Sequence, residues 1–150
     1  MALFRKLSPN DFDQWHELWL GYLEFYQHEL SDEQTRLTWS RFFDDYNLHG
    51  YVLEVDGKLV GFAHCSFTNS TWLEKPDLYL EDLFVSPEYR RQGLGERLIL
   101  ECSSIARDAG SRRLYWQTQR SNESAQALYR KVGTLSEYII FENVLEGQKP

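Results

Sequence analysis

The sequence predicts an α/β sandwich built on a mixed sheet, and three observations lead to this fold class. The spacing of apolar residues switches between a helical period and a period of two along the chain. Turn and cap residues separate the segments from one another. The 150 residues suit a single domain over residues 1–150, because no linker or low-complexity block divides them.

Each predicted element has a local signal of its own. Ser8 and Pro9 begin the first helix, since serine is a favoured N-cap and proline suits the first helical position. Asp56-Gly57 between two apolar runs indicates a β-hairpin, and Gly110 and Gly133 end the last two helices. The expected strands cover residues 2–7, 51–55, 58–68, 78–85, 113–118 and 138–144, and the expected helices cover residues 8–26, 32–45, 93–109 and 122–132.

Composition and charge exclude several classes of function. The formal net charge of −7 argues against general nucleic-acid binding, which requires a basic surface. The sequence has no run of about 18 apolar residues, so we expect no transmembrane helix and no membrane partner. Its first residues lack the apolar stretch of a signal peptide, and the two cysteines, Cys65 and Cys102, suit a reducing cytoplasm. An acidic surface attracts amines, although it also serves solubility alone.

The most informative segment runs from Leu80 to Gly95, where a strand enters a glycine-containing loop that opens a helix. A helix N-terminus presents free N–H groups, and glycine lets that backbone approach a pyrophosphate closely. Arg90 and Arg91 add permanent charge for phosphate oxygens. The segment is neither a P-loop, which needs Gly-Lys-Ser/Thr, nor a dinucleotide motif, because the third glycine of that motif is replaced by Leu98. A plain glycine turn with surface arginines is the alternative.

The segment Arg90-x-x-Gly93-x-Gly95, which follows a strand ending in Leu83-Phe84-Val85, resembles the acetyl-coenzyme A motif of the GNAT N-acetyltransferases. Residues 122–133 resemble that family's Asn-x-x-Ala-x-x-x-Tyr-x-x-x-Gly segment, and Val60-Gly61-Phe62-Ala63 extends the resemblance upstream. The combination of these three segments is specific, because they occur in the expected order along the chain. It implies a mixed, mostly antiparallel central sheet flanked by about four helices, with acetyl-CoA as co-substrate.

A narrower likeness concerns the acceptor. Trp72 and residues 78–85 are similar to the spermidine/spermine (diamine) acetyltransferases, whereas residues 115–118 and 128–132 look more like the small histone/polyamine acetyltransferases of fungi and bacteria. Both branches act on amines, so the resemblance implies a polyamine, a diamine or a related small primary amine. The terminal hairpin looks short for the family, and the resemblance implies a homodimer whose partner subunit completes the sheet or covers the cleft.

The resemblance also assigns residues to the coenzyme. Leu83 and Val85 would pair with the pantetheine amides as an added strand does, and residues 92–95 would hold the pyrophosphate. Asn122 would hydrogen-bond the pantetheine arm or merely cap its helix. The expected cofactor-binding residues are Leu83, Phe84, Val85, Arg90, Arg91, Gln92, Gly93, Leu94, Gly95, Asn122 and Tyr129.

Two acids, Glu81 and Asp82, lie in the middle of an apolar strand. Side chains alternate along a strand, so we expect them on opposite faces. Burying an unpaired charge is unfavourable, which makes an acid in such a place a candidate base. The resemblance favours Glu81, which matches the proposed base of the diamine acetyltransferases; Asp82 as base, or a merely exposed or salt-bridged acid, is the alternative. The resemblance also makes Tyr129 the proton donor to the departing thiolate, for which plain core packing is the alternative.

Acidic and aromatic side chains near the end of the first helix suit a polyamine, through ion pairs and cation–π contacts. We therefore expect Glu24, Glu29, Glu81 and Asp82 to contact the substrate, although a solvated helix end explains the first two equally well. The four histidines have no metal-ligand spacing, so we expect no metal. The alternative acceptors are a protein lysine or N-terminus, an amino acid or an aminoglycoside, and the alternative class is a non-catalytic acyl-CoA-binding module.

Overall fold

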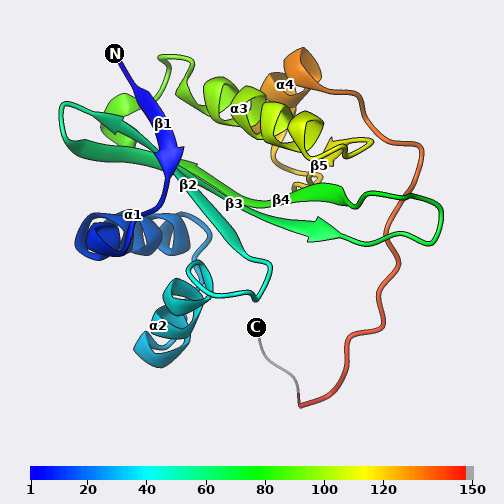
Figure 1. Cartoon of the computed structure of the whole chain (residues 1–150), viewed down its shortest axis with the longest axis horizontal. Helices are drawn as coiled ribbons and strands as arrows, with labels where there is room; N and C mark the ends of the chain where they lie inside the picture. The colour runs from blue at the N-terminus through cyan, green and yellow to red at the C-terminus, as the bar shows by residue number, and fades with distance from the viewer. Residues whose placement is uncertain (148–150) are drawn as a thin grey trace. The chain divides into compact units, whose positions relative to one another are not determined.

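The computed structural model describes residues 1–147, and the chain forms two compact units that divide after Gln117. The first unit is built on a five-stranded sheet with the order β1-β2-β3-β4-β5 (Figure 1). Neighbouring strands are antiparallel except for β4 and β5, which are parallel. The mixed, mostly antiparallel sheet expected from the sequence is therefore confirmed. The strands are β1 (Leu3–Lys6), β2 (His49–Val55), β3 (Lys58–Thr68), β4 (Asp77–Val85) and β5 (Leu114–Tyr115).

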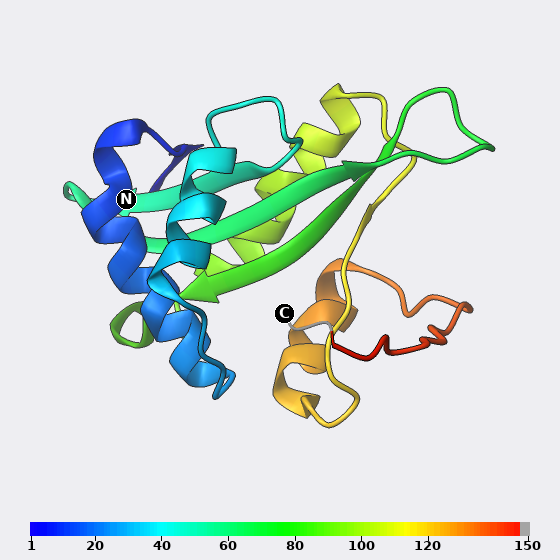
Figure 2. The same ribbon diagram turned by 90° about the horizontal axis from the view of Figure 1, so that it is seen from below.

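Helices cover both faces of this sheet, with α1 and α2 on one face and α3 on the other (Figures 1 and 2). Two neighbouring residues of β3 point to opposite faces of the sheet. His64 contacts Trp15 of α1, whereas Cys65 contacts Cys102 of α3. Successive side chains of a strand point to opposite faces, so one strand serves both layers. The helices of this unit are α1 (Phe12–Phe25), α2 (Asp32–Arg41) and α3 (Leu94–Asp108).

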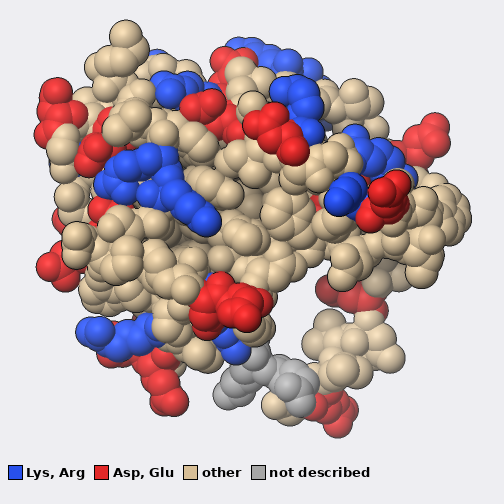
Figure 3. Space-filling model, viewed as in Figure 1, with Lys and Arg blue, Asp and Glu red and all other residues tan. Residues whose placement is uncertain are grey.

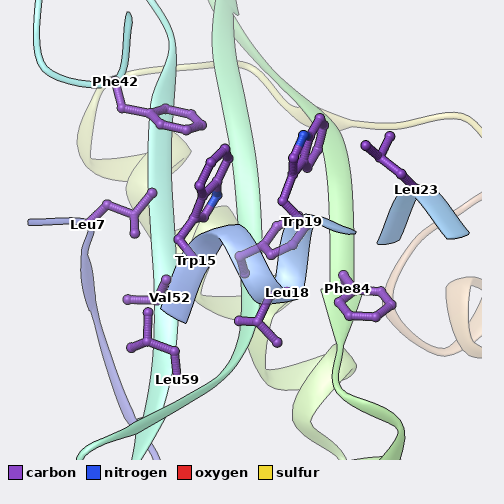
Figure 4. Close-up of a cluster of buried hydrophobic side chains, with 10 residues drawn as sticks. Leu7, Trp15, Leu18, Trp19, Leu23, Phe42, Val52, Leu59 and Phe84 are labelled. Carbon is purple, nitrogen blue, oxygen red and sulfur yellow. The ribbon is translucent and has the colours of Figure 1, made fainter. Parts of the chain in front are cut away.

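Aromatic side chains fill the layer between α1 and the sheet (Figure 4). Trp15 and Trp19 of α1 stack with their ring centroids 5.7 Å apart. Phe62 of β3 contacts Trp19 and also Phe84 of β4. The high aromatic content of the chain therefore supplies much of this core. The buried cluster consists of Leu7, Trp15, Leu18, Trp19, Leu23, Phe42, Val52, Leu59, Phe62 and Phe84.

An ion pair joins β1 to the start of α1. Ser8 caps the short turn Pro9–Asp11 that precedes the helix, as the sequence predicts, and its backbone N–H donates to Asp11 Oδ2 over 2.7 Å. Arg5 donates to both carboxylate oxygens of Asp11, at 2.8 and 3.0 Å. The Arg5 guanidinium lowers the pKa of Asp11, because hydrogen bonds from a cation favour the charged carboxylate.

The second unit contains α4 (Glu123–Val132), which begins after the N-cap Asn122 and ends at Gly133, as expected. The strand expected over residues 138–144 is wrong, since this stretch forms no strand. Its apolar side chains are exposed, with Phe141 90% accessible. A β-forming sequence becomes a strand only where a neighbouring strand accepts its hydrogen bonds, and within residues 1–147 none pairs with it. The strand expected over residues 113–118 is likewise only the two-residue β5.

We predict that Asp11→Asn lowers the free energy of unfolding by about 1–3 kcal/mol, because the change removes the charge that Arg5 and Ser8 hydrogen-bond. Urea denaturation at neutral pH measures the difference. Asp13→Asn is the matched control, since it removes an exposed acid from the same helical turn.

The same pair predicts a pH dependence. A carboxyl whose pKa is lower in the folded state contributes stability that is fully present above its unfolded pKa of about 3.9. That contribution is lost as the pH falls through the folded pKa. The gap between wild type and Asp11→Asn should therefore narrow below about pH 4, and a constant gap down to about pH 2 would contradict the assignment.

Candidate active site

A β-bulge interrupts β4 at Glu81. Leu80 pairs with Cys65 of β3, but Asp82 pairs with His64, so two steps along β4 face a single step along β3. Glu81 is the extra residue. The sequence-based expectation that Glu81 and Asp82 point to opposite faces assumed regular alternation, and this assumption is wrong here because the alternation is broken across the bulge.

The bulge brings Asp82 to the α1 side of the sheet, where both of its carboxylate oxygens accept hydrogen bonds. The hydroxyl of Tyr22 donates to Oδ1 over 2.8 Å, and Nδ1 of His64 lies 2.9 Å from Oδ2. Burial and the negative charge of Asp82 both raise the pKa of Tyr22, so its hydroxyl stays protonated and able to donate. Asp82 is therefore a partly buried carboxylate with a fixed orientation.

Glu81 differs from its neighbour. Its side chain reaches solvent, and within residues 1–147 no hydrogen bond or ion pair holds the carboxylate. Partial burial raises the pKa of Glu81, and the charge of Asp82 raises it further. Glu81 and Asp82 are therefore adjacent acids in different environments, one open to solvent and one held by hydrogen bonds, and the role of either as the base stays a prediction.

One edge of β4 beside this bulge is open. β5 pairs only with Leu78 and Tyr79, so in the described part of the chain no strand lies along residues 80–85 on that side. This open segment contains Leu83 and Val85, which the resemblance assigns to pantetheine. An extended ligand can hydrogen-bond to such an edge as an additional strand does.

The loop after β4 leads directly into the N-terminus of α3. Gly93 is the N-cap and has φ of +76°, a left-handed conformation that glycine adopts without steric strain. Since glycine has no side chain to cap the helix, no side-chain cap within the described residues satisfies the N–H groups of the first turn, from Leu94 onwards. These groups and the positive end of the helix dipole form a cradle suited to a diphosphate, which fits the sequence-based expectation for residues 92–95.

The two arginines before this cradle have different surroundings. Arg90 donates from Nε to the carbonyl oxygen of Val85 over 2.9 Å, and its guanidinium lies 5.4 Å from the ring centroid of Phe84. Arg91 is exposed and has φ of +63°. Arg90 thus closes the loop against β4, while the side chain of Arg91 extends into solvent. Phosphate binding by either residue stays a prediction.

Glu24 and Glu29 are both exposed, the first in the last turn of α1 and the second in the segment before α2. No hydrogen bond or ion pair within the described residues fixes either side chain. Sequence reasoning instead missed Tyr22 and His64, the two groups that hold Asp82. A histidine within a strongly apolar strand was the available signal, because a buried imidazole needs a hydrogen-bond partner.

The second unit carries the two remaining candidates, Asn122 and Tyr129. The side-chain oxygen of Asn122 accepts from the backbone N–H of Ala125 over 3.3 Å, so this residue caps α4. Tyr129 lies nearly two helical turns later, is partly buried, and its carbonyl accepts the bond from Gly133 that ends the helix. These positions match the expectation for the helix, and the roles toward the coenzyme stay predictions.

Two features are absent from residues 1–147, the part of the chain that the structure describes. No group of three or more histidine, cysteine, aspartate or glutamate side chains is placed to hold a metal ion. No helix in this part of the chain is both long and apolar enough to cross a membrane.

A glycine-opened helix that follows the fourth strand of a mixed, mostly antiparallel sheet is the arrangement expected of the acyl-transferring α/β proteins that the sequence resembles. The model of the Acetyltransferase (GNAT) family matches residues 12–134, and the chain belongs to this family. It is an N-acetyltransferase that acts on amines.

Relatives of several kinds are similar to the chain. The D-amino-acid N-acetyltransferase of Saccharomyces cerevisiae is 30% identical over 141 residues, which cover 92% of this chain and 88% of that protein. The thialysine N-epsilon-acetyltransferase of Bos taurus is 37% identical over 75 residues, or 50% of this chain and 44% of that protein. The solved structure of an aminoglycoside N-acetyltransferase in complex with CoA has a TM-score of 0.72 and 20% identity, with 95% of this chain and 99% of that chain covered.

Proposed function

We propose that the protein transfers an acetyl group from acetyl-CoA to a primary amine of a small molecule, with Glu81 as the general base. The observation that carries the proposal is the bulge in β4, which places an open carboxylate of raised pKa on the strand that leads into the glycine-opened helix. The proposed base and the proposed pyrophosphate site thus lie on one continuous segment of the chain.

The reaction needs a neutral amine, because an ammonium group has no lone pair. Glu81 accepts the proton of the amine, directly or through a water molecule. Acetyl-CoA supplies a thioester: its acetyl carbon forms the new C–N bond as the C–S bond breaks. Tyr129 then donates its proton to the departing sulfur. Holding both reactants in one ternary complex makes the attack effectively unimolecular, which supplies much of the rate acceleration.

The residues that would hold acetyl-CoA follow the same stretch. Leu83 and Val85 lie on the open edge of β4, and residues 92–95 surround the start of α3. Asn122 and Tyr129 are assigned from the resemblance of their helix to the family segment. The homodimer and the cytoplasmic location stay predictions.

The preferred acceptor is a polyamine or another small cationic amine. Asp82 supplies fixed negative charge, and Tyr22 and Tyr26 place aromatic rings on the same side of the sheet. Figure 3 shows acidic and basic side chains interspersed on its visible face, so the acidic surplus forms no single patch there. An amine would therefore be attracted by the acids of the site itself and not by one large acidic patch on this face. An amino acid is the second candidate, because the similarity to a D-amino-acid N-acetyltransferase extends over 92% of the chain.

Release of coenzyme A thiol with a panel of acceptors tests the proposal. The panel contains spermidine, a monoamine, D- and L-amino acids, thialysine and an aminoglycoside. We predict turnover with spermidine, and a KM for spermidine that Glu24→Gln/Glu29→Gln raises more than the KM for the monoamine, because two ion pairs are lost. Equal effects on both acceptors would leave these acids as ordinary surface. Turnover with amino acids alone would favour the second candidate, and binding of acetyl-CoA without turnover of any acceptor would contradict catalysis.

We predict that Gly95→Val weakens acetyl-CoA binding by about tenfold or more, because a branched side chain in the first turn of α3 crowds the backbone that would face the pyrophosphate. Gly95 gives a clearer test than Gly93, because the φ of +76° at Gly93 would strain any replacement. Calorimetric titration of the folded variant measures the affinity. Gly95→Ala is the graded control, and unchanged affinity in Gly95→Val would place the coenzyme elsewhere.

We predict that Tyr129→Phe lowers kcat by about 10²-fold, the lower end for loss of a general acid, because the thiolate is already a fair leaving group. Affinity for acetyl-CoA should barely change, since charge develops on sulfur only in the transition state. Single-turnover rates and calorimetry measure the two quantities. The deficit should shrink with an acetyl thiophenol ester, and a wild-type rate in the folded variant would reduce Tyr129 to a packing residue.

A further inference from the structure

A continuous chain of hydrogen bonds runs from the core of the first unit to the bulge in β4. Nε1 of Trp15 donates to Nε2 of His64 over 3.1 Å, and Nδ1 of His64 lies 2.9 Å from Oδ2 of Asp82. The hydroxyl of Tyr22 reaches the other oxygen of Asp82 over 2.8 Å. Trp15 is fully buried and His64 is 1% exposed, so the chain begins in the interior and ends beside Glu81.

The chemistry of the donors determines where the proton of His64 resides. An indole N–H can only donate, so Nε2 of His64 must accept with its lone pair. The ring proton therefore lies on Nδ1 and is donated to Asp82. Nε2 of His64 is thus the acceptor in its contact with Trp15, and Nδ1 is the donor in its contact with Asp82. The ring also stacks on Phe62, with centroids 4.4 Å apart, which fixes its plane.

The hydrogen bond from Nδ1 of His64 orients the Asp82 carboxylate. Burial and then the negative charge of Asp82 raise the pKa of Glu81, and His64 lowers it to a smaller extent. The titratable groups of the first unit that face Glu81 are Asp82 and Tyr79 on its own strand, His64 on β3 and Tyr22 on α1. Asp82 supplies the negative charge among them, and that charge acts on Glu81.

We propose that His64, Tyr22 and Trp15 are positioning residues of the acetyl transfer, which hold the Asp82 carboxylate beside Glu81 so that its charge strengthens Glu81 as the base. This inference rests on the proposed role of Glu81. None of the three residues needs to touch the substrate, because each acts through Asp82. The arrangement explains why a histidine lies within an aromatic core: phenylalanine would fill the same space without donating a hydrogen bond.

The test is a double-mutant cycle on the pH dependence of kcat/KM. Asp82→Asn removes the charge, and His64→Phe removes the hydrogen-bond donor that holds the Asp82 carboxylate while keeping a ring. Both variants should move the acid limb of the profile to lower pH by about half a unit or more, because the negative charge beside Glu81 is either removed or no longer held in place. Both should lower kcat about tenfold, less than loss of the base itself, and leave KM for acetyl-CoA unchanged.

Because His64 acts through Asp82, the double variant should behave like Asp82→Asn alone. The side-chain amide of His64→Asn can donate in place of Nδ1. This variant should therefore have an acid limb that lies closer to the wild-type pH than that of His64→Phe. Additive effects, or an unshifted acid limb in folded His64→Phe, would overturn the inference. If His64→Phe does not fold, Tyr22→Phe takes its place in the cycle, since it removes a single hydroxyl and keeps its ring. The effects of Tyr22→Phe and Asp82→Asn should again be non-additive. Additive effects would overturn the proposal.

Glu81→Gln separates this inference from the proposed function. If Glu81→Gln keeps the wild-type profile, Glu81 is not the base and the proposed mechanism fails. If Glu81→Gln loses the acid limb while His64→Phe and Asp82→Asn retain it unshifted, only the positioning chain fails.

Discussion

The β-bulge at Glu81 is the constraint on which the site depends. One additional residue in β4 lets Leu80 face Cys65 while Asp82 faces His64, two positions that a regular strand would place on the same face. Without the bulge, Asp82 could not meet the imidazole on the α1 side while Leu80 stays opposite Cys65. The bulge therefore produces two adjacent carboxylates, one held by hydrogen bonds and one open to solvent.

The second constraint is that the core and the site share side chains. Trp15 and Tyr22 each present a large apolar body to the core and a single polar atom to a partner, a combination suited to the border between the two. The aromatic layer under α1 thereby fixes His64, and His64 fixes Asp82. Because every member of the chain is satisfied, the network adds rigidity without leaving a buried polar group unpaired.

The proposed coenzyme side of the site depends on local backbone geometry instead. Gly93 has a left-handed conformation that ends one loop and begins α3, and β5 stops pairing with β4 after Tyr79. The first feature follows from glycine and its neighbours, so a sequence motif can predict it. The end of the pairing between β5 and β4 is a property of the sheet, because it depends on how far a neighbouring strand extends. The predicted strand over residues 113–118 was too long for that reason.

The sequence by itself determined the order of helices and strands as far as α4, the cap at Ser8, the glycine-opened helix and the family, because each depends on residues close together in the chain or on a fixed motif spacing. It also marked Glu81 and Asp82 as unusual acids in an apolar strand. Only the tertiary structure decided that they differ, since Tyr22 and His64 reach Asp82 from residues 60 and 18 positions away. It likewise decided that residues 138–144 form no strand, because a strand exists only through pairing that the segment's own sequence cannot provide.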